Sequence, residues 1–509
     1  MKVSCLMAKY LLIGAVGGPN FGDEIILSAW IKAIREADND AEILCDGYNP
    51  DNVAQFVGGD VYTLKSDESL WACTYSVVPD QEQKSSSSWR SIHDGFREPS
   101  RAWKAINCVD ALAHYNIDQI HIIGGGYLNA LWPANYILLL LARLLAWRSA
   151  ARIIATGLGL SPVKSEDISG LTGILSTFDY VDVRDTESYE LLKMSVPEHL
   201  SFSGDDALLF IHDGPPKYPL QNIGVPTLVI CLQNDLFPGD HIVSDLFSPA
   251  SMELLKTHGI HNIVYAAAMS ADVAGPSTEL RSVLENHGFS ISSLDPRQLT
   301  ESGFPVSDGG LVITSRYHPH FLASLSGYSG VALSTTGYYD TKHEAVRKMG
   351  SNWPVLNNDL DVDIYSAMSN ELNRKLPTFN KTARDSFVSK KKKMEHAIFA
   401  PHEKPNALPI DFIDIWSNNL RLLENSNRHC EDIRAEREET QKLYAQQLES
   451  NSELLSQLNN LQAKLDAMLA EVERISEELK QEKTARNLIL NSRAWKITAP
   501  LRWFFALFK

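Results

Sequence analysis

A glycine-rich segment between an apolar strand and an amphipathic helix constrains this chain most. Residues 14–24 read Gly-Ala-Val-Gly-Gly-Pro-Asn-Phe-Gly-Asp-Glu and follow an apolar run, Tyr10–Ile13, that predicts a buried strand. The apolar positions of Ile25–Ile34 recur at helical spacing and predict a helix. Glycines at such a junction let the backbone approach a ligand closely, and the start of a helix offers N–H groups to an anion.

Two acidic residues at the end of this segment, Asp23 and Glu24, change how it is interpreted. Carboxylates repel a phosphate, so they favour contact with a sugar hydroxyl or a proton transfer at the start of the helix. Alternatively, both residues only cap the helix and interact favourably with its dipole. The sequence leaves both interpretations open.

The size and charge of the chain exclude several classes of protein. A chain of 509 residues is too long for one hydrophobic core, so two or three domains are expected. The net charge of −16 argues against general nucleic-acid binding, which needs a basic face. The chain starts without a signal-peptide pattern, and the longest apolar run, Tyr136–Trp147, is shorter than the roughly 18 residues of a membrane span and is interrupted by Arg143. We expect a cytoplasmic protein that lies at the membrane surface.

The N-terminal part alternates strand-like and helix-like segments up to about Phe210. This alternation predicts a parallel sheet covered on both faces, and we assign residues 1–212 to an N-terminal Rossmann-like domain. Residues 80–101 interrupt it and are expected to form a loop or mobile insertion. The expected strands include Ala41–Cys45, Gln119–Ile123, Arg152–Thr156 and Tyr180–Val183, and the expected helices include Ala134–Trp147 and Glu187–Met194.

A proline-rich stretch, residues 213–226, predicts a linker to a second alternating block. We assign residues 227–375 to a C-terminal Rossmann-like domain, so the fold class is α/β. Two such domains in tandem predict a ligand cleft between them, at the carboxyl ends of the strands. The expected strands are Thr227–Leu232, Asn262–Ala267, Leu311–Thr314 and Val331–Ser334, and the expected helices are Ser251–Thr257, Pro276–Asn286, Pro319–Ser326 and Thr341–Met349.

The remaining chain changes in character twice. Residues 376–426, which include the basic run Lys390–Lys393, are expected to form a connecting helical region. Residues 427–490 are rich in Glu, Gln, Lys and Leu, and their apolar positions follow alternating steps of four and three, which predicts a coiled coil and a homo-oligomer. A single amphipathic helix packed on the globular part is the alternative. The apolar positions are Leu454, Leu458, Leu461, Leu465, Met468, Val472, Ile475 and Leu479.

The last residues, 491–509, combine tryptophan and phenylalanine with Arg and Lys and contain no acidic residue. Such a segment is too short to span a bilayer but suits the headgroup region of a membrane. We expect an amphipathic tail that contacts the membrane surface. Burial against the rest of the protein is the alternative.

Two glycine motifs and one charged motif follow strands of the N-terminal domain. Gly124-Gly125-Gly126 closes the Gln119–Ile123 strand, and Thr156–Pro162 follows the next strand, so the backbone is expected to pass close to a ligand at both places. In Val183–Ser188, Arg184 suits bidentate binding of a carboxylate or phosphate. The alternative is a structural Arg184–Asp185 pair, with Asp185 or the following threonine as a helix cap.

A cation and an imidazole come directly after the Leu311–Thr314 strand. Arg316 and His318 are two residues apart, which suits anion binding combined with proton transfer. His320 falls within the following helix and is the weaker candidate. Lys342, after the next strand, adds a second positive charge or is merely solvated.

Seven short motifs in this order resemble the polysaccharide pyruvyl transferase family over roughly residues 10–350. The resemblance implies a two-domain fold like that of type B glycosyltransferases and the transfer of a pyruvyl group from phosphoenolpyruvate to a sugar, usually as a ketal. The motifs are Asn20-Phe21-Gly22-Asp23-Glu24, Gly124-Gly125-Gly126, Gly157-Leu158-Gly159, Val183-Arg184-Asp185 with Glu187-Ser188, Gly204-Asp205, Arg316-Tyr317-His318, and Asp340 with Lys342.

The tail resembles a second pattern. Residues 492–502, Ser-Arg-Ala-Trp-Lys-Ile-Thr-Ala-Pro-Leu-Arg, are similar to a C-terminal segment of many bacterial enzymes that build surface polysaccharides. This resemblance implies a role in O-antigen, capsule or exopolysaccharide biosynthesis, with the protein peripheral at the inner face of the bacterial cytoplasmic membrane. We expect a saccharide or a lipid-linked oligosaccharide as the acceptor.

The candidate site follows from the charges of phosphoenolpyruvate. Its phosphate and carboxylate need fixed cations, for which Arg184, Arg316 and Lys342 are the candidates. We hypothesise that His318 protonates the terminal methylene carbon and that Asp23 orients or deprotonates the acceptor hydroxyl, with Asp205 as the alternative base. Further substrate-binding candidates are Asn20, Glu24, Gly124, Gly125, Gly126 and Asp205. No His, Cys or Asp cluster has metal-ligand spacing, so no metal or cofactor is expected.

Two other functions stay open. A nucleotide-sugar-dependent glycosyltransferase would use Arg316 and Lys342 on a diphosphate and would need acidic residues near the ribose, for which the loop from Leu294 to Leu311 offers Asp295, Glu301 and Asp308. A non-catalytic scaffold for polysaccharide assembly would depend on the coiled coil alone.

Overall fold

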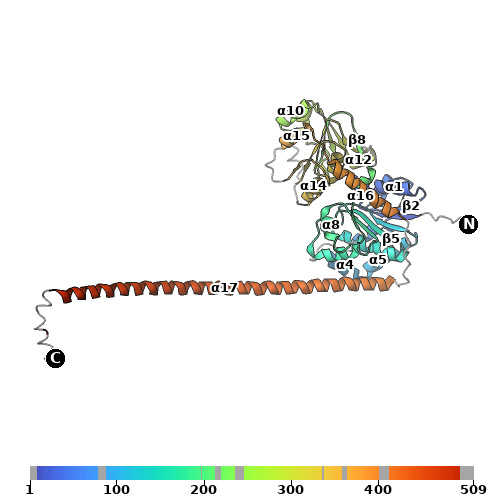
Figure 1. Cartoon of the computed structure of the whole chain (residues 1–509). Coiled ribbons are helices and arrows are strands. Elements are labelled where there is room, and N and C mark those ends of the chain that lie inside the picture. Colours follow the sequence, from blue (N-terminus) through green and yellow to red (C-terminus); the bar gives the residue numbers. More distant parts are fainter. Residues whose placement is uncertain are drawn as a thin grey trace. The chain divides into compact units, whose positions relative to one another are not determined.

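The computed structural model describes residues 8–77, 88–196, 198–211, 219–234, 246–334, 337–357, 364–400, 412–492 and 502, with the side chains of the last helix from residue 432. The chain divides into two compact units, Met1–Asn427 and Arg428–Lys509. The first unit contains two parallel α/β sheets, coloured blue to cyan and green to orange in Figure 1, and the second consists mainly of one long helix.

The first sheet has seven parallel strands in the order β3-β2-β1-β4-β5-β6-β7. The strand order reverses between β1 and β4, as in a Rossmann fold, and this switch point leaves a crevice at the carboxyl ends of the two strands. The buried strands confirm the expected α/β class. Their bounds are β1 (Lys9–Ile13), β2 (Glu42–Asp46), β3 (Tyr62–Thr63), β4 (Gln119–Ile122), β5 (Arg152–Leu158), β6 (Tyr180–Val183) and β7 (Leu200–Phe202).

Helices cover this sheet because most of them carry one apolar face. The leucine-rich run expected as a buried helix is α6 (Tyr136–Ser149), in which ten residues are buried, from Tyr136 to Ala146. The other helices are α1 (Phe21–Ala37), α2 (Pro50–Val57), α3 (Leu70–Val77), α4 (Ser88–Phe96), α5 (Pro99–Ala113), α7 (Ile168–Leu175) and α8 (Thr186–Leu192), with short 3₁₀-helices η1 (Pro133–Asn135), η2 (Ser165–Asp167) and η3 (Asp206–Phe210).

The second sheet repeats this topology with six parallel strands in the order β11-β10-β9-β13-β14-β15, so its switch point lies between β9 and β13. Its strands are β9 (Thr227–Cys231), β10 (Asn262–Ala266), β11 (Ser290–Leu294), β13 (Leu311–Thr314), β14 (Gly330–Leu333) and β15 (Val355–Leu356). Its helices are α10 (Pro249–Thr257), α11 (Thr278–Asn286), α12 (Pro296–Ser302), α13 (Tyr317–Leu325), α14 (Gly337–Met349) and α15 (Ile364–Leu372).

The two α/β domains share a hydrophobic core. The N–H of Phe21, at the start of α1, donates to the carbonyl of Ala268 in the second domain at 2.8 Å. Phe21 and Ile25 are fully buried in one apolar cluster with second-domain residues such as Phe304. The glycine-rich segment therefore leads into a helix that joins the domains.

Helix α16 (Lys381–Phe399) returns from the second domain to the first. It contacts α14 at one end, and Met394 and Ile398 enter the core of the first domain at the other. Arg152 donates to the carbonyl of Ile398 at 2.6 Å. In Figure 1 this orange helix lies beside α1. The expected connecting region thus contributes to the core of the N-terminal domain.

Two expected irregular segments contain regular structure. The interpretation of residues 80–101 as a loop is wrong from Ser88 onward, because α4 and α5 begin there and Trp89 stacks on Tyr136 with ring centroids 5.5 Å apart; residues 80–87 lie outside the described part. Within the expected linker, β8 (Leu220–Asn222) pairs with β12 (Phe304–Val306), because Leu220 is buried against the second domain. Residues 212–218 lie outside the described part.

The second unit contains most of α17 (Phe412–Asn491), a helix of 80 residues that begins in the first unit. The expected long helix is therefore present, and its eight heptad residues are between 50% and 67% exposed.

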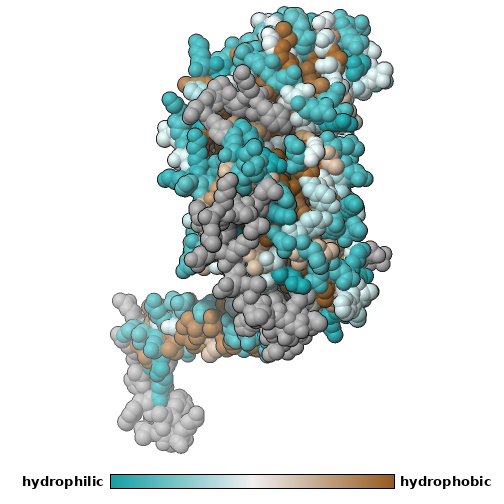
Figure 2. All heavy atoms as spheres, turned by 90° about the vertical axis from the view of Figure 1, so that its right-hand side faces the viewer, coloured by the Kyte–Doolittle hydropathy of each residue, from teal (hydrophilic) through white to brown (hydrophobic). Residues whose placement is uncertain are grey.

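Figure 2 shows a mainly hydrophilic face of the globular unit, with hydrophobic side chains in small groups. No helix among the described residues is long and apolar enough to cross a membrane. Pairing of α17 with a second copy stays a prediction, and most of the expected tail, residues 493–501 and 503–509, lies outside the described residues.

Candidate active site

A cavity of about 410 Å³ lies between the two α/β domains. It forms where both sheets reverse their strand order: Ala15 follows β1 and Gly126 follows β4, and Arg316 follows β13 in the other domain. Its lining includes two groups of side chains. The charged cluster consists of Asp23, Arg184, Arg316, His318 and Lys342, and the aromatic cluster consists of Tyr48, Trp71, Tyr75, Tyr127 and Trp132.

All three predicted cations line this cavity, but Arg316 already has a carboxylate partner. Its Nε lies 3.0 and 3.2 Å from the two carboxylate oxygens of Asp272, and its Nη2 also donates to Asp272. Asp272 is only 5% exposed, and the N–H of Met269 also donates to it. The sequence analysis missed Asp272 because it lies in a loop 44 residues away. This pair holds the guanidinium of Arg316 in one orientation at the cavity wall.

Arg184 lies over an aromatic ring. Its guanidinium carbon is 4.5 Å from the centroid of the Tyr317 ring, which comes from the second domain. Its Nη1 is 3.5 Å from Asp205. Gly159 makes room for this side chain, since a Cβ atom there would come within 2.4 Å of the arginine Nε. Asp185 has the role of a helix cap that the sequence offered as an alternative. It caps α8 by accepting from the N–H of Ser188 at 2.8 Å.

His318 occupies a position between the domains that only glycine leaves open. It lies in the first turn of α13, and its ring packs on Gly22 in the first turn of α1. A Cβ atom on Gly22 would lie 1.9 Å from His318 Nδ1. On the other side of the ring, His318 Nε2 lies 3.6 Å from Asp205 Oδ2. The glycine of the Asn-Phe-Gly-Asp-Glu motif thus accommodates the imidazole.

Asp205 is fully buried behind this imidazole and is not among the residues that line the cavity. Burial alone would raise the pKa of Asp205, but His318, Arg184 and the donated N–H of Ala207 together hold it below its ordinary value. The carboxylate is therefore a fixed negative charge beside His318. This location fits a positioning residue better than a direct contact with substrate.

Asp23 does line the cavity. Its side chain accepts a hydrogen bond of 2.6 Å from Asn20, whose own oxygen caps α1 by accepting from the N–H of Gly22. Burial raises the pKa of Asp23 to about 6, although His318, Lys342 and Arg184 oppose the shift. A carboxyl with this pKa is well placed to accept a proton near neutral pH.

The glycine-rich segment 14–24 is not an open anion cradle. The N–H of Gly17 donates to Glu24 at 2.8 Å, that of Phe21 to Ala268, and that of Gly22 to Asn20, so three of its amide donors are occupied within the protein. Glu24 is buried and is not among the residues that line the cavity. Burial raises the pKa of Glu24 to about 7. The structure thus places Glu24 as a partner of the loop backbone.

The triple glycine packs against a second buried carboxylate, Asp206. The N–H of Gly124 donates to Asp206 at 3.1 Å, and a Cβ atom on Gly124 would come within 2.9 Å of this carboxylate. Gly125, with φ +150°, leaves room for Tyr127, which a Cβ atom there would meet at 2.7 Å. Gly126 lines the cavity. Gly124 and Gly125 therefore shape the cavity floor, and Gly126 alone reaches its surface.

A buried lysine from the basic run completes this floor. Lys391 of α16 is 1% exposed and lies 2.9 Å from Asp206 Oδ1 and 3.2 Å from Asp182 Oδ2. Burial by itself lowers the pKa of Lys391, but the two carboxylates outweigh burial and raise it. The sequence analysis missed this network because its members lie about 200 residues apart.

Lys342 lines the cavity and lies over the ring of Tyr339, 5.1 Å from its centroid. The hydroxyl of Tyr339 lies 3.5 Å from Arg316 Nη1, so this ring connects the two cations of the second domain. His320, the weaker candidate, is fully buried in α13 against His343 and Ser351. Burial lowers the pKa of His320 well below its ordinary value, so the ring is neutral and structural.

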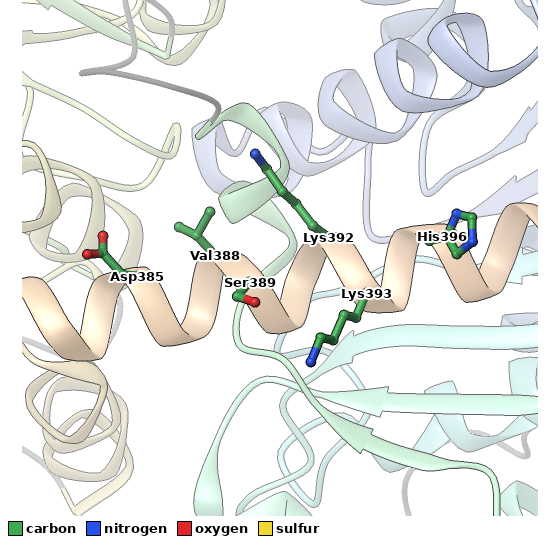
Figure 3. Close-up of a pocket in the computed structure, with 6 residues that line it drawn as sticks. All are labelled: Asp385, Val388, Ser389, Lys392, Lys393 and His396. Atoms are coloured by element: carbon green, nitrogen blue, oxygen red, sulfur yellow. The ribbon is translucent and has the colours of Figure 1, made fainter.

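A second hollow, of about 540 Å³, runs along α16 beside Asp385, Ser389, Lys392, Lys393 and His396. In Figure 3 the side chains of Lys392 and Lys393 point to different sides of the helix. They therefore do not converge on one ligand. Within the described ranges, no group of three or more His, Cys, Asp or Glu side chains is placed to hold a metal ion.

The comparison with protein families agrees with the motifs. The family model described as polysaccharide pyruvyl transferase matches residues 20–268. These residues are similar to the polysaccharide pyruvyl transferase family. The resemblance predicted from the motifs is confirmed over these residues, and the match indicates a transferase that acts on polysaccharide. Asp23, Arg184 and Asp205 lie inside the matched residues, whereas Arg316, His318 and Lys342 come from the part of this chain that follows them.

No curated protein matches the sequence significantly. Among solved structures, the chain resembles UGT89C1 of Arabidopsis thaliana complexed with UDP, at 14% identity, 83% of this chain, 100% of that chain and a TM-score of 0.43. It also resembles a putative UDP-N-acetylglucosamine 2-epimerase from Listeria monocytogenes, at 13% identity, 80% and 100% coverage and a TM-score of 0.43. A third similar structure is the S. aureus MnaA–UDP co-structure, at 13% identity, with 78% of this chain and 99% of that chain covered and a TM-score of 0.44. The expected two-domain, glycosyltransferase-B-like arrangement rests on the two facing Rossmann-like sheets of this chain itself.

The acidic residues weighed for a nucleotide-sugar site are not among those that line the cavity. Asp295 caps α12 by accepting from the N–H of Gln298. Glu301 pairs with Arg297 at 2.9 Å, and Asp308 accepts from Asn222 at 3.1 Å. The structure therefore brings none of the three to the charged cluster.

Proposed function

We propose that this protein transfers a pyruvyl group from phosphoenolpyruvate to a sugar of a cell-surface polysaccharide or of its lipid-linked precursor, forming a ketal. One observation carries the proposal. Three cations, an imidazole and a carboxylate with a pKa of about 6 line a single cavity between the domains of a chain with a polysaccharide pyruvyl transferase match.

The donor carries a phosphate and a carboxylate, both of which suit the charged cluster. Arg316 is oriented by Asp272, which favours directional contact with one of the two anionic groups. Arg184 and Lys342 add positive charge from the two domains. A ligand that contacts both sides of the cavity stabilises a closed arrangement that excludes water.

In the first step, His318 donates a proton to the terminal methylene carbon of phosphoenolpyruvate, which becomes a methyl group. The electron pair of the C=C bond forms the new C–H bond and leaves an electron-poor carbon that bears the phosphate and the carboxylate. A sugar hydroxyl adds to this carbon and loses its proton. Asp23, as the base, accepts it.

In the second step, a neighbouring sugar hydroxyl displaces phosphate from the same carbon and closes the ketal ring. This hydroxyl also loses its proton. Over the whole reaction, one proton enters the methyl group and two leave the hydroxyls, and the remaining one departs with phosphate. Asp205 holds His318 from behind and acts as a positioning residue.

The test uses the full-length protein with phosphoenolpyruvate and saccharide and glycolipid extracts from cells that lack the protein. Phosphate release that depends on both the donor and the extract, together with the mass gain of a pyruvyl ketal on a saccharide, supports the proposal. A panel of nucleotide sugars serves as the alternative donor. Sugar transfer from one of these, with no consumption of phosphoenolpyruvate, contradicts it.

We further propose that α17 joins copies of this chain and that residues 491–509 contact the membrane. The stripe from Leu454 to Leu479 exposes apolar side chains at heptad spacing, which a second copy would bury. A chain that ends at Ser426 should have fewer subunits in light scattering and should not sediment with vesicles of anionic lipid. An unchanged subunit number contradicts the first part, and unchanged sedimentation the second.

A further inference from the structure

The aromatic cluster gathers five rings from four separate segments of the N-terminal domain. Tyr48 lies in the loop after β2, Trp71 and Tyr75 lie one turn apart on α3, Tyr127 follows the triple glycine, and Trp132 precedes η1. All of them line the same cavity as the charged cluster. The donor chemistry described above uses none of them.

The rings support one another. Trp71 is only 2% exposed and forms the base, with centroids 5.5 Å from Tyr127, 6.4 Å from Tyr75 and 6.4 Å from Tyr48. Trp71 and Tyr75 are stacked, with 26° between their planes, and Tyr48 meets Tyr75 edge-on at 5.9 Å. Such contacts fix the orientation of the Tyr48 and Tyr75 rings.

The outer rings nevertheless expose much of their surface. Tyr48 is 59% exposed, Tyr75 is 51% exposed and Trp132 is 43% exposed. Large rings that are held in place inside a cavity but left uncovered are typical of a binding surface. A ligand that covers these rings removes their apolar surface from water, which makes its binding more favourable.

The polar groups at the edge of the cluster are also held in place. The Tyr75 hydroxyl donates to Asn135 Oδ1 at 3.3 Å, and Asn135 Nδ2 donates to the carbonyl of Tyr127 at 2.8 Å. Aromatic rings beside fixed hydroxyl and amide groups complement a pyranose, which has an apolar C–H face and a rim of hydroxyls.

We infer that the aromatic cluster is the acceptor subsite and binds the C–H face of a neutral pyranose unit. None of the five side chains is charged, which favours a neutral ring over the anionic donor. The role of this pyranose as the acceptor rests on the proposed function. A pyranose bound to these rings lies in the same cavity as the charged cluster. Tyr75 and Trp132 are its main stacking partners.

The test uses saturation-transfer NMR on the full-length protein, with the methyl glycosides of glucose, galactose, mannose and N-acetylglucosamine and the disaccharides lactose and cellobiose as probes. We expect transfer to the C–H protons of at least one probe. Tyr75→Ala and Trp132→Ala should each weaken its affinity roughly tenfold, the loss expected for one aromatic contact. Tyr75→Phe should keep most of the affinity because it keeps the ring.

Trp103→Ala is the matched control, since Trp103 on α5 is 60% exposed and is not among the cavity-lining residues. Thermal unfolding of each variant identifies any loss of folding. Absence of transfer to every probe overturns the inference, and so does a glycoside affinity of the Tyr75→Ala and Trp132→Ala variants that equals that of the wild-type protein. It is likewise overturned if uridine or farnesol, and no glycoside, receives saturation that these two substitutions abolish.

The same samples are titrated with phosphoenolpyruvate, with tryptophan fluorescence as the readout. Wild-type protein and Tyr75→Ala should bind it equally. If the wild-type protein binds glycosides but not phosphoenolpyruvate, the proposed donor is wrong while the saccharide subsite stands. If it binds phosphoenolpyruvate but no glycoside, only the subsite is wrong.

Discussion

The charged cluster and the aromatic cluster share one cavity but are held in place by different forces. The side chains of the charged cluster are oriented by ion pairs and close contacts between distant segments, such as Arg316 with Asp272 and His318 with Gly22. Four rings of the aromatic cluster pack on one another within one domain, with Trp71 as the base for Tyr48, Tyr75 and Tyr127. The cavity therefore combines a region suited to anions with a region suited to apolar faces.

This difference suggests a division of labour between the domains. The second domain supplies Arg316, His318 and Lys342, whereas the first supplies the five rings of the aromatic cluster together with Asp23 and Arg184. A donor held by charge and an acceptor held by stacking can be perturbed independently. The predictions below test this independence, in order of decreasing effect.

His318→Ala should cause the largest loss of activity. Removing a general acid lowers kcat by about 10²–10⁴, and the affinity for a glycoside should stay unchanged because His318 is not part of the aromatic cluster. Steady-state rates and saturation-transfer NMR give the two numbers. His287→Ala, on the surface of the second domain, serves as the control. Near-full activity of His318→Ala would remove the imidazole from the mechanism.

Asp23→Asn should change the pH dependence as well as the rate. Burial raises the pKa of Asp23 to about 6, so the ionised fraction, and with it kcat/KM, should increase as the pH rises through about 6. The variant should lose about 10²-fold in rate at neutral pH, and the ascending limb should disappear. Rates measured from pH 5 to pH 8 test this, because the range begins about one pH unit below this pKa and ends about two units above it. An unchanged limb in the variant would assign it to another group.

Gly22→Ala should act through His318. The new methyl group would fall 1.9 Å from His318 Nδ1, so the ring must move, and misplacement of about 1 Å can cost roughly 10²-fold in kcat. A double-mutant cycle with His318→Ala measures the coupling: Gly22→Ala should have little further effect once the imidazole is absent.

Gly173→Ala is the matched control for this substitution. Gly173 lies in α7, where a Cβ atom would meet nothing within 4 Å. This variant should keep the wild-type rate. Additive losses in the cycle would show that Gly22 acts independently of His318.

Added salt should give the smallest effect and separate the clusters most simply. Ions screen the charged cluster, so the KM for phosphoenolpyruvate should rise a few-fold as the ionic strength increases from about 0.05 M to about 0.5 M. Glycoside affinity, which depends on uncharged rings, should change little or increase. Parallel titrations at both ionic strengths measure the two responses. Equal salt sensitivity would contradict the distinction between the clusters.

The sequence predicted the elements that local pattern controls. The strands Tyr180–Val183 and Leu311–Thr314 have the expected bounds, because short apolar runs between turn residues are strand signals in themselves. The heptad pattern likewise identified the long helix. Short elements such as β8, β11 and β12 were missed, since their polar residues or prolines hide the pattern and only pairing with neighbours stabilises them.

For the candidate site, the sequence predicted the strand ends and therefore the residues that reach the cavity. It did not predict which of these side chains form ion pairs or hydrogen bonds with other residues of the chain. Asp272 lies in a loop without a recognisable motif, and Lys391 lies in a basic run that gives no sign of burial. The aromatic cluster was missed because its rings are spread over 85 residues and carry no common spacing.

The sequence by itself determined the α/β class, the alternation of strands and helices and the long C-terminal helix, because hydrophobic periodicity is encoded over short distances along the chain. Only the tertiary structure decided that Glu24 lies outside the cavity lining, that Asp205 lies behind His318 and that Gly22 makes room for the imidazole. Those relations depend on contacts between segments up to about 300 residues apart, where the packing of two domains, and no local preference, fixes the distance between side chains.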